Sequence, residues 1–335
     1  MASPDARSAD AYMPGVAVDI LTGFLGSGKT TLLRHVLDHG LRGKPVAVIM
    51  NEIGEIGIDG RVVTGLSAVE KMVELSSGCI CCSIDDYRFD LAIQEIIATA
   101  HPHLIIIEST GLADPEPLGY RVKNAGLGLD AVITVVDAAN VDRHLAETEI
   151  AGAQIAAADF LVVNKLDLVA PEALVGIEGR LARLNRRAER FRTVRGALDS
   201  DLLFATGVAS FREQAGRTTG HLEAEGIASF VYRSPRPLAQ DAFERFLERL
   251  PRDILRAKGI VRFVDRDWHC LFSFTCGRHE ISWLKLDDAA PRENQAVFIG
   301  RALDRHRPRI EAALAACEAG EPDRTDVRGL NLGPH

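Results

Sequence analysis

A short glycine-rich segment near the start of the chain constrains its fold more than any other feature. Residues 23–30 read G-F-L-G-S-G-K-T, which matches the phosphate-binding pattern G-x-x-x-x-G-K-[ST]. That pattern requires a strand before it and a helix after it. Residues 16–21 form an apolar, strand-like run, and residues 31–37 have the composition of a helix. We therefore predict a phosphate-binding loop between a β-strand and an α-helix, and not an ordinary glycine-rich turn.

The residue types in this loop suit a nucleoside triphosphate. Glycines let successive backbone N–H groups turn toward an anion at the positive end of the helix. Lys29 is predicted to reach the β- and γ-phosphates, and the Thr30 hydroxyl is predicted to bind Mg²⁺. The residues that we expect to contact the nucleotide here are Gly23, Gly26, Ser27, Gly28, Lys29, Thr30 and Thr31.

Length and composition set the class of protein. The chain has 335 residues, enough for about two domains, each with its own core. Its net charge of −8 gives no sign of a nucleic acid or an anionic membrane as partner. No apolar run approaches the roughly 20 residues that span a bilayer, and residues 1–13 lack the features of a secretory signal. Three of the six cysteines fall within four positions, unlike a disulfide framework, which favours a reducing cytoplasm.

Strand-like and helical stretches alternate through the first two hundred residues. One helical stretch, residues 86–100, has apolar residues at helical spacing. This alternation predicts an α/β fold, a doubly wound and mostly parallel sheet with ligands at the carboxyl ends of the strands. The expected strands lie near residues 16–21, 46–50, 104–107, 131–136 and 159–163.

The pattern changes after about residue 206. A smaller α+β unit is predicted to follow, with a strand at 228–232, a helix at 238–250, several strands between 258 and 300, and a helix near 306–318. The predicted organisation is a disordered tail (1–13), a P-loop domain (14–206), a linker (207–226), a C-terminal domain (227–320) and a flexible tail (321–335).

Two further motifs follow apolar strands and complete the predicted nucleotide site. Asn164, Lys165 and Asp167 form an N-K-x-D motif, in which the aspartate would accept paired hydrogen bonds that guanine offers and adenine does not. Glu108 begins E-S-T-G, where it would hold Mg²⁺ through water while the N–H of Gly111 meets the γ-phosphate. The alternatives are a polar turn for the first motif and a solvated loop for the second.

A cysteine cluster is the second distinctive feature. Cys79, Cys81 and Cys82 stand within four residues, and thiolates are soft donors suited to Zn²⁺ or another late transition metal. Inert buried cysteines and a redox relay are the alternatives.

Residues 51–59, with two glycines and three carboxylates, are interpreted as a switch segment in which Glu55 is an extra candidate metal ligand. A plain solvated loop is the alternative.

Taken together, the motifs resemble one family. GFLGSGKTT, NEIGEIGID, GCICC, ESTGLADP and NKLD, in this order, look like the CobW family of metal-handling GTPases, which is related to the nickel-insertion proteins UreG and HypB. Residues 255–259 and 297–300 are similar to the C-terminal domain of that family, so the resemblance covers most of residues 14–318.

The resemblance implies GTP hydrolysis coupled to delivery of a metal, zinc first and cobalt next, to a client protein. It implies that Cys79, Cys81 and Cys82 contribute to the metal site and that Glu108 replaces a more common Asp. Many relatives carry a histidine-rich stretch between domains, whereas this linker has only His221, which argues against a large metal-storage role. No glutamine or arginine finger is evident, so a client or a partner in a homodimer is expected to speed turnover.

Alternatives from other classes stay open at this point. A small-molecule kinase would share the phosphate loop but would leave N-K-L-D and the cysteines unexplained. A non-catalytic metal sensor or buffer would make the intact Lys29, Thr30 and Asp167 redundant. The C-terminal unit holds two histidines and two cysteines close together in sequence: His269, Cys270, Cys276 and His279. A hairpin could bring them together as a second metal site. The alternative is that they alternate into the core of a strand.

Overall fold

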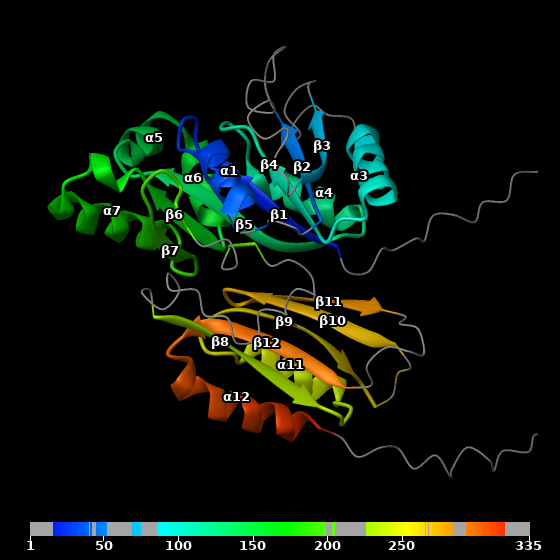
Figure 1. Ribbon diagram of the computed structural model, residues 1–335. Coiled ribbons are helices and arrows are strands. Elements are labelled where there is room, and N and C mark those ends of the chain that lie inside the picture. Colours follow the sequence, from blue (N-terminus) through cyan, green and yellow to red (C-terminus); the bar gives the residue numbers. More distant parts are fainter. Residues whose placement is uncertain are drawn as a thin grey trace, which may run out of the picture.

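The chain folds around two β-sheets, shown one above the other in Figure 1. The structure is a computed structural model. It describes residues 16–39, 41, 45–51, 69–75, 86–198, 203–204, 226–264, 266, 268–284 and 293–318.

The first sheet has seven strands, all parallel, in the order β3-β2-β4-β1-β5-β6-β7. All five predicted strands are present, which confirms the predicted fold class. The sequence did not predict β3 and β7, the two edge strands. The strands are β1 (Ala17–Thr22), β2 (Val46–Asn51), β3 (Val69–Leu75), β4 (Leu104–Glu108), β5 (Gly128–Asp137), β6 (Phe160–Asn164) and β7 (Glu189–Arg192).

Helices cover both faces of this sheet. On one face lies α1, whose Leu33 and Val36 pack with Leu21 of β1. On the other face α3 and α4 pack over β1 and β4, and α5, α6 and α7 over β5 and β6. The helices are α1 (Lys29–His39), α3 (Asp86–Ala100), α4 (Pro115–Asn124), α5 (Val141–Glu147), α6 (Glu149–Ala157) and α7 (Pro171–Leu184), with a 3-10 turn η1 (Leu166–Leu168).

Local sequence explains where two of these helices begin. The side chain of Asp114 accepts a hydrogen bond of 3.0 Å from the N–H of Glu116, and Pro115 occupies the first position of α4. In the same way, Thr148 accepts a hydrogen bond from the N–H of Ile150 at the start of α6. Both helices border the loop that follows β4, so these caps fix one wall of the site described below.

The second sheet has five antiparallel strands in the order β11-β10-β9-β12-β8. Its elements are β8 (Ile227–Ser234), α11 (Gln240–Glu248), β9 (Ile254–Arg262), β10 (His269–Thr275), β11 (Arg278–Leu284), β12 (Asn294–Arg301) and α12 (Leu303–Cys317).

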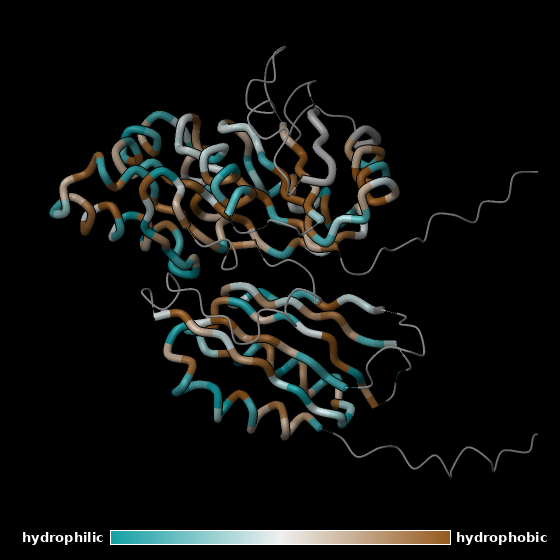
Figure 2. The backbone as a smooth tube through the Cα atoms, viewed as in Figure 1, coloured by the Kyte–Doolittle hydropathy of each residue, from teal (hydrophilic) through white to brown (hydrophobic). Residues whose placement is uncertain are grey.

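The two sheets share part of their cores. One face of the second sheet packs against α11 and α12 in a core of its own, which includes Phe243, Phe272 and Leu314. The opposite face contributes Leu255 and Val297 to the same cluster as α1 and β1, so the expectation of one separate core for each domain is only half right. In Figure 2 the central strands of the first sheet are largely hydrophobic, whereas the strands of the second sheet and α12 mix hydrophobic and hydrophilic residues. Among the described residues, no helix combines the length and apolarity that crossing a membrane requires.

Candidate functional site

The predicted phosphate-binding loop connects the end of β1 to the start of α1. Gly23 and Gly28 have φ angles of +137° and +107°, which side chains rarely adopt. A Cβ at Gly23 would lie 2.3 Å from the carbonyl oxygen of Val135, and one at Gly28 would lie 2.4 Å from Nδ2 of Asn164. The loop therefore needs glycine at both positions, because neighbouring strands approach its backbone closely.

Charged and hydroxyl groups of this segment gather inside the loop. Lys29 is only 9% exposed, and its Nζ donates hydrogen bonds to the carbonyl oxygens of Gly23 at 2.9 Å and Phe24 at 3.5 Å. Ser27 is fully buried, and its hydroxyl has no hydrogen-bond partner within the described part of the chain. A buried cation and an unsatisfied buried hydroxyl next to a helix N-terminus suit an anionic ligand. Thr31, by contrast, is exposed.

Thr30 lies next to Glu108 at the carboxyl edge of the sheet. The Thr30 hydroxyl donates a hydrogen bond of 3.0 Å to Oε1 of Glu108, which is 5% exposed. They meet because β4 pairs directly with β1, so the two strands end side by side. Both side chains offer hard oxygen ligands, which Mg²⁺ prefers, so the pair fits a magnesium ion.

Asn164 connects two loops around the site. Its side chain donates a hydrogen bond of 2.9 Å to the carbonyl oxygen of Ser27 and accepts one of 3.1 Å from the N–H of Gly196, which follows β7. Asp167 is exposed in η1, the short turn after β6. The N-K-x-D motif thus starts against the phosphate-binding loop and ends at the surface.

Lys165 has a partner that the sequence analysis missed. This lysine has a left-handed backbone (φ 62°), and its Nζ lies 2.7 Å from Oδ2 of Asp137 at the end of β5. Partial burial would raise the pKa of Asp137, but hydrogen bonds from Lys165 and Asn140 outweigh it and hold that pKa below its ordinary value. The position of Asp137 directly after an apolar strand was the signal that could have identified it.

His144 is a second missed residue near the loop. Its ring lies 4.4 Å from the ring of Phe24, centroid to centroid, and the histidine is 5% exposed. Burial lowers the pKa of His144, which favours the neutral imidazole. A neutral ring packed on Phe24 supports the phosphate-binding loop from the side of α5.

Gly111 lies directly against the phosphate-binding loop. A Cβ at Gly111 would lie 2.6 Å from the backbone nitrogen of Leu25, a distance that a side chain cannot occupy. The loop after β4 and the loop after β1 are therefore in contact at this glycine.

The predicted transition-metal ligands cannot be placed. Cys79, Cys81, Cys82, Glu55 and the side chains of residues 51–59 lie outside the described residues. Across the described part of the chain, no group of three or more His, Cys, Asp or Glu side chains is arranged to hold a metal ion.

The idea of a second metal site in the C-terminal unit is wrong. Cys270 packs in the core under α11 and α12, whereas Cys276 packs in the core shared with the first sheet. Burial raises the pKa of both thiols to about 12, so neither is poised to form a thiolate. Successive residues of a strand point to opposite faces, and the two cysteines lie in different cores, so His269 and His279 do not converge with both cysteines.

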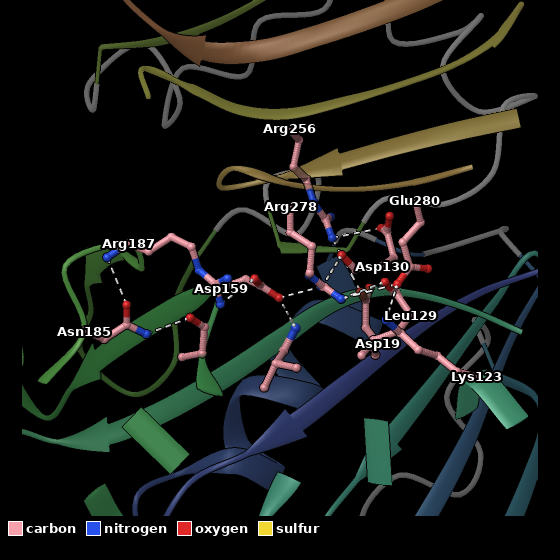
Figure 3. Close-up of polar contacts among 12 residues, drawn as sticks. Asp19, Lys123, Leu129, Asp130, Asp159, Asn185, Arg187, Arg256, Arg278 and Glu280 are labelled. Carbon is pink, nitrogen blue, oxygen red and sulfur yellow. Dashed lines mark hydrogen bonds and ion pairs between the residues drawn. The ribbon is translucent and has the colours of Figure 1, made fainter. Parts of the chain in front are cut away.

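Charged residues hold the second sheet against the first. Arg256 of β9 is 3% exposed and lies 2.9 Å from Oδ2 of Asp130 and 3.4 Å from Oδ1 of Asp19 (Figure 3). We call Asp19, Asp130 and Arg256 the interface cluster. Beside it, Arg278 of β11 reaches Oδ2 of Asp159 at 2.7 Å.

The two carboxylates of the interface cluster behave differently. Burial raises the pKa of Asp19, and the neighbouring Asp130 adds to the rise while Arg256 opposes it. Burial would also raise the pKa of Asp130, but Arg256, Lys258 and Arg278 outweigh it and lower that pKa. Since Asp19 stands on β1, four residues before Gly23, the cluster connects the second sheet to the strand that carries the phosphate-binding loop.

Together, a doubly wound parallel sheet, a phosphate-binding loop before α1 and a Thr–Glu pair at the strand ends define a P-loop nucleotide-binding protein. Family profiles then identify the group. Residues 17–192 match the CobW/HypB/UreG nucleotide-binding domain, and residues 227–318 match the cobalamin synthesis protein cobW C-terminal domain. The chain belongs to the CobW/HypB/UreG family, as its motifs predicted.

Curated relatives are consistent with this assignment. The chain is 33% identical over 323 residues to the zinc chaperone YjiA of Escherichia coli, covering 90% of this chain and 99% of that protein. It is 31% identical to the zinc chaperone CobW of Pseudomonas aeruginosa, covering 90% and 93% of the two chains. It is also 38% identical over 200 residues to the zinc-regulated GTPase metalloprotein activator 1 of Schizosaccharomyces pombe, covering 57% of this chain and about half (48%) of that protein.

Among solved structures, the chain is similar to a Zn(II)-bound YjiA GTPase from E. coli, with 28% identity and a TM-score of 0.44 over 92% of this chain and 100% of the other. The Schizosaccharomyces pombe relative is named a GTPase, which agrees with the predicted class of enzyme.

Proposed function

We propose that this protein is a GTP-hydrolysing metallochaperone that binds a transition metal through Cys79, Cys81 and Cys82 and delivers it to a client protein. Zinc is the first candidate metal and cobalt the second. The observation that carries the proposal is the arrangement of Lys29, Thr30 and Glu108 at one edge of the sheet, in a chain whose relatives are named zinc chaperones.

The nucleotide half of the proposal assigns roles to described residues. Lys29 binds the β- and γ-phosphates, and the backbone of residues 23–28 surrounds them. Thr30 and Glu108 would hold Mg²⁺, which supplies positive charge to the phosphates when bound. Gly111, which lies against the phosphate-binding loop, would present its N–H to the γ-phosphate.

Guanine specificity is assigned to the N-K-x-D motif. The exposed carboxylate of Asp167 accepts hydrogen bonds from the base, and Asn164 keeps the motif in place through Ser27 and Gly196. Lys165 lies along the base or ribose, held by Asp137. Adenine lacks the matching donors and would leave Asp167 unsatisfied.

The metal half rests on the chemistry of the cysteines and on the names of the relatives. Three thiolates bind Zn²⁺ or Co²⁺ and leave one position of a tetrahedral ion open, which suits a metal that is passed on. Glu55 is a candidate fourth ligand. A reducing cytoplasm would keep the thiols available.

We further propose that the γ-phosphate orders residues 51–59 and the three cysteines, so that metal and GTP bind cooperatively. Hydrolysis then loosens the thiolates and releases the metal to a client metalloprotein. Reciprocity requires GTP to tighten metal binding by the same factor by which metal tightens GTP binding. A client or a second copy in a homodimer accelerates the slow intrinsic hydrolysis.

The test begins with protein purified without added metal. Elemental analysis and competition titrations with Zn²⁺ and Co²⁺ are carried out in the presence of Mg²⁺ and either a non-hydrolysable GTP analogue or GDP. We expect tighter metal binding with the analogue. Equal metal affinities with the two nucleotides would contradict the coupling, and phosphate transferred to a metabolite would favour a small-molecule kinase.

The matching genetic test separates the chaperone from a sensor or buffer. A Lys29→Ala chain that retains full biological activity would show that nucleotide binding is dispensable. If a Cys81→Ser variant binds Zn²⁺ with the affinity of the natural chain, Cys81 is not a ligand of the metal, and the proposed cysteine site is contradicted.

A further inference from the structure

The loop between β4 and α4, residues 109–114, is anchored at both of its ends. At its start, the Ser109 hydroxyl donates a hydrogen bond of 2.8 Å to the Thr22 hydroxyl, and the Ser109 N–H donates one of 2.9 Å to the carbonyl oxygen of Leu21. At its end, Asp114 caps α4. The first anchor belongs to β1, the strand that leads into the phosphate-binding loop.

The middle of the loop is held by one buried side chain, Gln154 of α6. Its amide group donates hydrogen bonds to the carbonyl oxygens of Gly111 at 3.2 Å and Ala113 at 3.0 Å. Gln154 is 1% exposed. The backbone carbonyl oxygen of Gln154 accepts a hydrogen bond of 2.7 Å from the Thr134 hydroxyl, and this bond connects α6 to β5. The glutamine therefore joins the loop to the rigid sheet.

The position that Gln154 fixes is a demanding one. Gly111 touches the backbone of Leu25 in the phosphate-binding loop so closely that a Cβ would overlap it. Gly111 therefore contacts both the phosphate-binding loop and, through Gln154, α6. A shift of Gly111 relative to Leu25 would distort its hydrogen bond with Gln154.

We infer that Gln154 is a positioning residue that holds Gly111 where its N–H meets a γ-phosphate, and that Gln154 thereby sets the preference for GTP over GDP. The inference rests on the proposed function, since it needs a nucleotide in the phosphate-binding loop. GDP has no γ-phosphate and does not use the loop after β4, so the loss of Gln154 weakens GTP binding selectively. Glutamine suits the task because its neutral amide supplies two donors to two carbonyls.

The test uses two variants of Gln154. Gln154→Leu removes both donors, and Gln154→Glu keeps the length of the side chain while an ionised carboxylate can only accept hydrogen bonds. Each is titrated with a non-hydrolysable GTP analogue and with GDP in the presence of Mg²⁺. We expect affinity for the analogue to fall about tenfold, the effect of one to two lost hydrogen bonds, and affinity for GDP to stay within about twofold.

Asn185, which follows the last residue of α7, offers a matched control. It is also a buried amide, and it donates hydrogen bonds to the carbonyl oxygens of Ile155, Ala156 and Ala158 without touching residues 109–114. We expect Asn185→Ala to lower the melting temperature but to leave the ratio of the two nucleotide affinities unchanged. The ratio therefore separates a loss of positioning from a loss of stability.

The outcomes distinguish this inference from the function it rests on. If the natural chain binds no GTP analogue, the proposed function is wrong and this role with it. If the natural chain binds the analogue and either folded Gln154 variant keeps the natural ratio, the inference alone is overturned. The same holds if both nucleotides weaken equally. Should Gln154→Leu fail to fold, Gln154→Glu decides.

Discussion

Two regions of the parallel sheet bury carboxylates, and they use them differently. At the carboxyl edge, Glu108 lies 3.0 Å from the Thr30 hydroxyl, within a site built from the ends of neighbouring strands. In the middle of β1, Asp19 lies beside Arg256, which is 237 residues away in sequence. The first carboxylate stands at the predicted nucleotide site, and the second contacts an arginine of the other sheet. The comparison teaches that where a carboxylate stands along a strand decides what it does.

The largest effect is expected at the interface cluster. Arg256→Met would leave Asp19 and Asp130 buried without their shared guanidinium, and removing one partner from a buried ionic network costs about 3–5 kcal/mol. Urea unfolding of the two chains measures this loss.

An exposed arginine provides the control for that experiment. Arg192 pairs with Glu178 at 2.7 Å, but its side chain is 59% exposed, so Arg192→Met should cost less than about 1 kcal/mol. Equal losses for the two variants would mean that the interface cluster does not hold the sheets together.

The next effect concerns the carboxyl edge. Lys29→Ala removes the buried ammonium group from the phosphate-binding loop, and we expect affinity for GTP to fall about 100-fold, the cost of losing a strong hydrogen bond between charged groups. Titration with a fluorescent GTP analogue measures it. Lys123→Ala, at a lysine that is 51% exposed and pairs with Glu280, should bind nucleotide normally. A small loss for Lys29→Ala would remove this lysine from the site.

A smaller effect depends on pH and sharpens the comparison. Burial raises the pKa of Asp19 to about 8, so the folded chain holds a proton there that the unfolded chain releases near pH 4. This contribution to stability is present at low pH and is lost as pH rises toward 8. Asp130 has the opposite sign, because its lowered pKa adds stability that is lost as pH falls below about 4.

Asp19→Asn isolates the first of these two terms. Asparagine cannot ionise, so the free energy of unfolding of this variant should decline less between pH 5 and pH 8.5 than that of the natural chain. Urea unfolding at several pH values measures both curves. Parallel curves would show that Asp19 is ionised in the folded chain across this range.

The smallest effect tests the missed partner of Lys165. Asp137→Asn removes the charge of the carboxylate that holds the Lys165 ammonium group, whose side chain is 30% exposed, so we expect GDP affinity to fall about two- to fivefold. Isothermal titration measures it. An unchanged affinity would mean that Lys165 reaches the nucleotide without Asp137.

Much of the fold was predictable because buried parallel strands are continuously apolar. Phe160–Asn164 and Leu104–Glu108 are buried at every position, and both were predicted to within a residue or two. The edge strands were not predictable in this way. Glu189–Arg192 alternates charged residues around one fully buried side chain, Phe191, and Val69–Leu75 carries three charged residues. Such short, mixed segments lack the apolar run that identifies a central strand.

The residues of the candidate site divide in a similar way, into those that a motif predicts and those that only packing brings to the site. Motifs predicted Lys29, Thr30 and Glu108 as site residues because phosphate-binding chemistry needs fixed spacing close to strand ends. Asp137 and Gln154 belong to no motif, and they gain a role only through the packing of β5 and α6 beside the loops. Nothing in the local sequence of Gln154 separates it from an exposed helical glutamine.

The sequence by itself determined that this chain is a P-loop protein of the CobW/HypB/UreG family, because phosphate binding and parallel-sheet burial both leave local, periodic patterns. Only the tertiary structure decided that the second sheet shares a core with α1, that Arg256 joins Asp19 and Asp130, and that Gln154 holds Gly111. These contacts join residues that are far apart in the chain, and their energy depends on burial that no single segment provides.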